Sequence, residues 1–146
     1  MTARFTQVTK GRWPTGIDKP IAVLRAEPDE LSERYGLRFH AGSDDLDRFQ
    51  EAALRLGSGR PVLLYRYERS PSAGTTVTVD QGDHAREALD ELCAALHLRR
   101  RGITWVSDEI AGDAEAGGLI SAISGSVVTG MLSDFVTLLL GKARLH

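Results

Sequence analysis

Pro61-Val-Leu-Leu-Tyr-Arg-Tyr-Glu68 is the stretch of the chain that most directly indicates the fold. Its aliphatic, β-branched and aromatic residues favour a β-strand, and strand alternation places Tyr65 and Tyr67 on the same side. The run 75–79, Thr-Thr-Val-Thr-Val, alternates in the same way after a short loop that contains Gly74. The two runs therefore predict a β-hairpin.

A helix is expected directly after this hairpin. Asp83 is a good N-cap residue, and Gly102 suits the position that follows the end of a helix. The apolar residues that recur at helical spacing are Ala85, Leu89, Leu92, Cys93 and Leu96. The apolar run 103–106 then predicts a short strand.

The residues before the hairpin predict two strands and two helices. The run 21–24 is a short apolar strand, and residues 29–35 form a short helix that Gly36 ends. Residues 37–40 alternate as a strand. We expect a second helix over 43–56, with Ser43 as its cap and acidic residues in its first turn. Its buried stripe would be Leu46, Phe49, Ala53 and Leu56.

This order of elements predicts an α+β fold within a single domain, 1–146. From about 37 to 106 the order is that of a ferredoxin-like β-α-β-β-α-β core, with both helices on one face of an antiparallel sheet. Residues 1–36 would add an N-terminal arm, an edge strand and a short helix. An acidic, glycine-rich linker at 107–118 would lead to an apolar helix, whole or broken, at 119–141.

Composition excludes several classes of protein. The chain is 42% apolar and 26% charged, with a net charge of −2, which argues against a general nucleic-acid binder and against a disordered acidic chain. Its one cysteine excludes an intramolecular disulfide and a cysteine-cluster metal site. The polar first ten residues do not resemble a secretory signal, so we expect a cytoplasmic protein.

The apolar segment 119–140 contains one charged residue, Asp134. It fits three roles: a membrane span, a cover for the open face of the sheet, or a contact with a second copy. The position of Asp134 inside the segment and the basic residues Lys142 and Arg144 beyond it disfavour a membrane span. We expect a homodimer, and the candidate contact residues are Leu119, Ile123, Val127, Met131, Phe135 and Leu139.

No motif for catalysis, cofactor binding or metal binding stands out. The four histidines lack the spacing of a helical zinc site. Asp44, Asp45 and Asp47 suit the first turn of a helix, and Cys93 lies in an apolar stripe. Tyr65 and Tyr67 could stack on bases, but the sequence around them lacks the pattern of an RNA-binding strand, so nucleic-acid binding is not expected.

Two functions follow as hypotheses. The first is a non-catalytic interaction module, regulatory, accessory or of the immunity type, that recognises a protein partner. The second is a small-molecule sensor or a cofactor-independent enzyme with a pocket between the sheet and the C-terminal helix. The candidate pocket residues are His40, Tyr65, Tyr67 and Trp105. An interaction module would show a continuous exposed patch, whereas a ligand site would show convergent polar groups.

Overall fold

The computed structural model describes residues 4–117, which form an α+β fold with one sheet and three α-helices. The elements, in chain order, are β1 (Phe5–Gln7), the 3-10 turn η1 (Lys10–Arg12), β2 (Lys19–Leu24), α1 (Pro28–Tyr35), β3 (His40–Ser43), β4 (Arg48–Leu56), β5 (Pro61–Tyr67), β6 (Thr75–Val79), α2 (Ala85–Leu96), the 3-10 turn η2 (Arg100–Gly102), β7 (Ile103–Val106) and α3 (Asp108–Gly117).

The sheet has seven strands in the order β1-β4-β5-β6-β2-β7, and β3 pairs with the free part of β4's outer edge. Every pairing among the described strands is antiparallel. The predicted hairpin of β5 and β6 is confirmed. The strand expected at an edge, β2, instead lies between β6 and β7.

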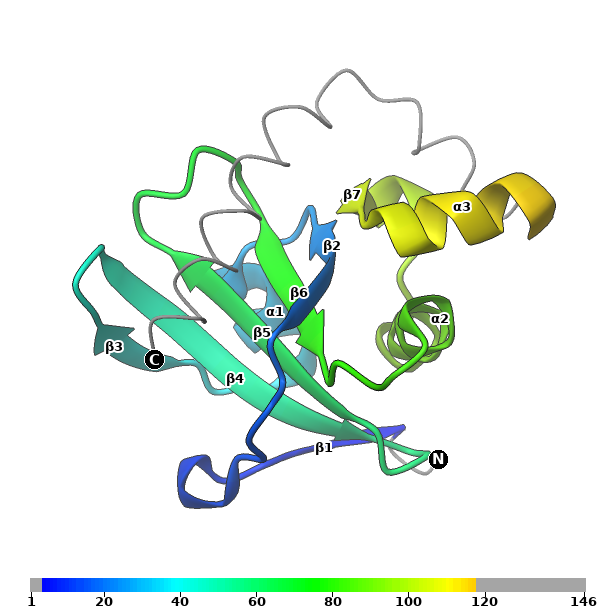
Figure 1. Ribbon diagram of the computed structural model, residues 1–146. Helices are drawn as coiled ribbons and strands as arrows, with labels where there is room; N and C mark the ends of the chain where they lie inside the picture. Colours follow the sequence, from blue (N-terminus) through cyan, green and yellow to red (C-terminus); the bar gives the residue numbers. More distant parts are fainter. Residues whose placement is uncertain (1–3, 118–146) are drawn as a thin grey trace.

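One face of the sheet carries the main core. Leu31 of α1 and Leu89, Leu92 and Leu96 of α2 are buried in one core cluster with alternate residues of β5 and β6. Both helices therefore lie on the same side of the sheet (Figure 1). Burying each such aliphatic side chain contributes roughly 1.5–3 kcal/mol. The residues between them on each strand, among them Tyr65 and Tyr67, face the other side.

The helix predicted over residues 43–56 is wrong, because this segment is the β3–β4 hairpin. Asp44 starts the turn: its Oδ1 accepts hydrogen bonds from the amides of Leu46 (3.0 Å) and Asp47 (3.1 Å). The strand β4 then pairs with β3 and β1 on one side and with β5 on the other. These pairings override the helix propensity of a run rich in alanine and leucine.

The ferredoxin-like order is therefore not the one observed, since four successive strands, β3 to β6, separate α1 from α2. The strand expected at 37–40 also begins later, at His40. By contrast, α1 and β7 lie close to their predicted ranges, and Gly36 ends α1 in the left-handed conformation as expected (φ 70°).

The ends of α2 differ from the prediction. Its N-cap residue is His84 rather than Asp83, and its C-cap residue, His97, adopts the left-handed conformation (φ 52°) usually taken by glycine. Gly102 instead closes η2. The acidic segment predicted as a linker forms α3 instead. Acidic residues in its first turn stabilise the positive end of the helix, and Ile110 is buried in the main core.

The arm between β1 and β2 runs across the sheet (Figure 1), and the Val8 amide donates to the Ala53 carbonyl of β4 (2.9 Å). No helix within residues 4–117 has the length and apolar character to cross a membrane. The apolar C-terminal helix and the expected dimer contacts Leu119 to Leu139 lie outside the described residues.

Candidate functional site

A row of directly opposed residues crosses the sheet on the face away from α1 and α2. His40 of β3 is opposite Glu51 of β4, and Glu51 is opposite Tyr65 of β5. Directly opposed residues in antiparallel strands project from the same face. The strands thus place an imidazole, a carboxylate and a phenol side by side.

The same row continues from Tyr65 through Thr76 and Val23 to Trp105 of β7. All four predicted pocket residues therefore face the same side of the sheet, but they do not form one site. Trp105 lies three strands from Tyr65, about 14 Å at the usual strand spacing. It packs instead against Val23 in a small buried cluster apart from the main core.

The other three candidates lie in a cluster of rings. The centroids of Tyr65 and Tyr67 are 5.8 Å apart, those of Phe49 and Tyr67 are 5.7 Å apart, and those of Trp13 and His40 are 5.7 Å apart. All three pairs meet edge to face, the geometry that aromatic rings favour. We call Trp13, His40, Phe49, Tyr65 and Tyr67 the aromatic cluster.

An ion pair lies within the aromatic cluster. The Lys10 ammonium is 3.6 Å from Glu51 Oε1 and 5.2 Å from the centroid of the Trp13 ring. The Glu51 side chain is 19% exposed, and that of Lys10 is 51% exposed. The Trp13 indole donates to the Val8 carbonyl (2.9 Å), which fixes the ring on the arm. A partly buried carboxylate thus faces a cation that approaches from the solvent side.

Burial shifts the pKa of the acidic groups in the cluster. It raises the pKa of Glu51, although the charges of Lys10 and His40 act in the opposite direction. It also raises the pKa of Tyr65, and the neighbouring Tyr67 adds to the effect. The pKa of Tyr67 is raised by burial, by the hydrogen bond its hydroxyl donates to Asp44 Oδ2 (2.9 Å), and by nearby carboxylates. Both phenols therefore remain neutral donors at physiological pH.

The residues Lys10, Phe49 and Glu51 were not among the predicted site residues. Phe49 and Glu51 lie in the segment predicted as a helix. Residues of a helix would not pair with Tyr65 and Tyr67 of a neighbouring strand. The alternation of Phe49, Glu51 and Ala53, read as a strand pattern, is the signal that would have placed them beside Tyr65 and Tyr67. Nothing local in the sequence indicates the long-range contact of Lys10.

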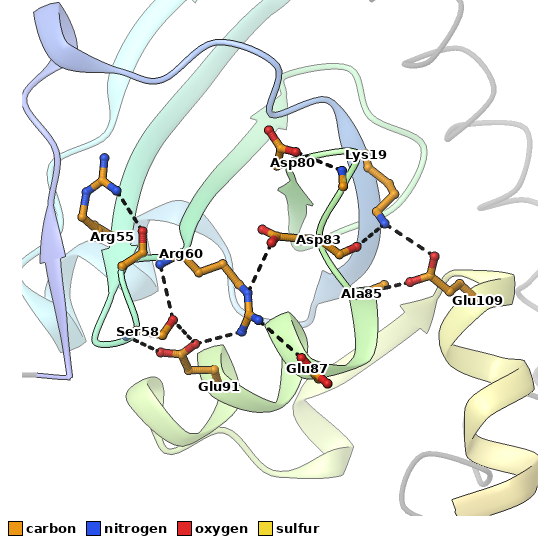
Figure 2. Close-up of polar contacts among 12 residues, drawn as sticks. Lys19, Arg55, Ser58, Arg60, Asp80, Asp83, Ala85, Glu87, Glu91 and Glu109 are labelled. Atoms are coloured by element: carbon orange, nitrogen blue, oxygen red, sulfur yellow. Dashed lines mark hydrogen bonds and ion pairs between the residues drawn. The ribbon is translucent and has the colours of Figure 1, made fainter.

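A second group of charges, around Arg60, joins the β4–β5 turn to α2 (Figure 2). The guanidinium lies 3.0 Å from Glu91, 3.5 Å from Glu87 and 3.6 Å from Asp83. Burial alone would raise the pKa of Glu91, but hydrogen bonds from Ser58 and the charge of Arg60 outweigh it and lower that pKa. Since each of these acids faces Arg60, the group fits a structural role.

The acidic β3–β4 turn and Cys93 do not provide a reactive centre. The carboxylates of Asp44 and Asp47 accept hydrogen bonds from the turn and from Arg69. No group of three or more histidine, cysteine or acidic residues in the described part of the chain could hold a metal ion. Burial and the charge of Asp90 raise the pKa of Cys93 to about 11, so its thiol is a poor nucleophile at neutral pH.

The concave regions of the described surface include a groove beside α1, lined by residues such as Leu31, Tyr35 and Leu98, and a hollow at the β3–β4 turn, lined by residues such as Asp44, Asp47 and Arg69. Neither region combines edge-to-face ring pairs with a partly buried carboxylate, as the aromatic cluster does. Among large apolar side chains of the described residues, Leu46 alone is exposed, at 50%. The described residues therefore do not form a broad exposed apolar patch.

In comparisons with known proteins, no protein-family model, curated protein or solved structure matches the chain. The function is therefore inferred from the geometry of the aromatic cluster.

Proposed function

We propose that this protein is a non-catalytic, regulatory binding protein, and that its ligand is a small molecule received by the aromatic cluster. The observation that carries the proposal is the convergence of rings and of the partly buried Glu51 carboxylate on one sheet face. These groups come from β3, β4, β5 and the arm.

The composition of the cluster supports binding. Ligand sites combine aromatic and apolar walls with a small number of placed polar groups. Strands hold Glu51, Tyr65 and Tyr67 more rigidly than a loop would, which suits recognition. A carboxylate whose pKa is raised by burial is also more frequent at functional sites than elsewhere.

A purely structural role explains less of the arrangement. The arm is already tied to the sheet by the Val8–Ala53 hydrogen bond and to itself by the Trp13 indole. An ion pair with a half-exposed partner such as Lys10 adds at most about 1 kcal/mol, whereas burial of the Glu51 carboxylate is unfavourable. Retaining a charge at this position is easier to explain if the charge contacts a ligand.

A fragment screen of the full chain by protein NMR tests this proposal. Binding fragments should shift the signals of Glu51 and Tyr65, and both Glu51→Gln and Tyr65→Leu should weaken binding at least tenfold. Gln50→Ala is the matched control, because Gln50 is exposed on the opposite face of the same strand. Fragments that bind the three variants as tightly as the wild type would contradict the proposal, and turnover of a bound compound would contradict its non-catalytic part.

A second candidate is a protein-interaction module, of the accessory or immunity type, that forms a homodimer through residues 119–141. The observation that favours it is the apolar stripe of this segment, with the single charge of Asp134. Sedimentation of the full chain tests it. Val127→Asp, on the stripe, should convert a dimer to a monomer, whereas Thr129→Asp, off the stripe, should not. A wild-type chain that sediments as a monomer would exclude the dimer.

For both candidates we propose that the protein acts in the cytoplasm.

A further inference from the structure

The charge that occupies the aromatic cluster is the protein's own. The Lys10 ammonium lies over the Trp13 ring, 5.2 Å from its centroid, and 3.6 Å from Glu51 Oε1. An indole face combined with a carboxylate is an arrangement that attracts ammonium groups, because the ring quadrupole and the negative charge act in the same direction. The site therefore accommodates a cation.

The Lys10 side chain is weakly held in this position. It projects from the short turn η1 on the arm and is 51% exposed, while its partner Glu51 is 19% exposed. An ion pair with one half-exposed, flexible partner contributes little net stability. A second ammonium that brings its own apolar contacts would therefore displace Lys10 at little cost.

The groups around Glu51 also favour a positively charged ligand. The Asp44 carboxylate accepts a hydrogen bond from the Tyr67 hydroxyl, which adds a second negative charge near the rings. The Tyr67 ring lies beside those of Phe49 and Tyr65. Burial raises the pKa of both tyrosines, so neither adds a phenolate charge beside Glu51. The positive charges that act on Glu51 come from Lys10 and from His40, which lies opposite Glu51 on β3.

We propose that the ligand of the aromatic cluster is an amine in its cationic form, a primary or quaternary ammonium compound, whose charged group replaces the Lys10 ammonium between Trp13 and Glu51. The inference rests on the proposed function and names the class of ligand. Lys10 then acts as an internal occupant that keeps the carboxylate paired when the ligand is absent.

Titration of the full chain with choline, methylammonium and the neutral choline isostere 3,3-dimethyl-1-butanol tests this inference, with the Trp13 indole N–H signal as the reporter. We expect at least one cation to bind tenfold tighter than the neutral isostere. Lys10→Ala should strengthen cation binding about fivefold or more, because it removes the competitor, and Glu51→Gln should weaken it at least tenfold. The matched control is Arg12→Ala, an exposed cation on the same turn, which should change the affinity less than twofold.

The outcomes separate the two proposals. Equal binding of the isostere and the cations, or weaker cation binding by Lys10→Ala, would overturn the cationic ligand while leaving a ligand site at the cluster. If neither these probes nor any screened fragment perturbs the signals of Trp13 and Tyr65, both the inference and the proposed function fail.

Discussion

At the scale of single residues, the negative charge of Glu51 opposes folding because the carboxylate is partly buried. Its pKa is raised in the native state, mainly by burial, so folding favours the protonated carboxyl. Stability from this group is therefore present at low pH and is lost as the pH rises through the folded pKa. A binding site that holds a partly desolvated charge is a common cause of such a loss.

Glu51→Gln removes this dependence on pH. Relative to the wild type, the variant should gain stability between pH 3 and pH 7, because glutamine stays neutral while Glu51 ionises. Urea unfolding midpoints at the two pH values measure the change. Glu33→Gln, at an exposed carboxylate of α1, is the control and should show little change. A relative stability of Glu51→Gln that falls as the pH rises would show that Glu51 is stabilised as an anion by Lys10.

A substitution at Gly74 tests whether the chain before β6 needs a residue without a side chain. It has a φ of 107°, and a Cβ at this position would lie 2.0 Å from the Leu24 carbonyl oxygen. Gly74→Ala should therefore destabilise the protein by about 1–3 kcal/mol or more. Gly59→Ala is the matched control, since Gly59 has a φ of 93° but open space around it. Equal losses of unfolding free energy in the two variants would rule out the predicted clash with Leu24.

At the scale of elements, the predictable parts were those whose partners are local. The hairpin of β5 and β6, the amphipathic helix α2 and the capped helix α1 all follow from short-range patterns. The strand β4 did not, because residues 48–56 satisfy a helical stripe as well as a strand alternation. Pairing with three other strands decides between them: β3 and β5 are the neighbours of β4 in the chain, whereas β1 comes from the N-terminal end.

The misassigned strand also explains why the candidate site was only half predicted. The sequence placed Tyr65 and Tyr67 on one face and selected His40 as a neighbour. It did not place Glu51 between His40 and Tyr65, because that position depends on the register of β3, β4 and β5. Trp105 was correctly assigned to a strand. Its separation from Tyr65 depends on the order of the strands in the sheet, which the sequence does not show.

The helix α3 caps α2 from a distance. The Ala85 amide, at the start of α2, donates to Glu109 Oε2 (2.7 Å), and the Lys19 ammonium lies 3.5 Å from Glu109 Oε1 (Figure 2). Glu109→Ala should therefore cost about 0.5–2 kcal/mol, as for loss of an N-cap. Asp108→Ala, an exposed acid in the same first turn of α3, should cost less. Chemical denaturation of both variants checks this, and equal losses would mean that the charge on α3, rather than the cap of α2, matters.

At the scale of the whole molecule, the sheet separates two environments. One face carries α1, α2 and the main core, of which the sequence indicated the apolar stripe of α2. The other face carries the aromatic cluster at the end formed by β3, β4 and β5, and the Val23–Trp105 pair at the opposite end. We propose that the two faces have different roles, stability on the helical face and binding on the other.

The most direct test of that claim is the position at which small molecules bind the full chain, measured from ligand-induced shifts of backbone and ring signals in NMR spectra. We predict that binding compounds perturb Trp13, Glu51, Tyr65 and Tyr67 together. Perturbations centred instead on Leu31, Tyr35 and Leu98, in the groove beside α1, would place the site on the helical side and would contradict the account.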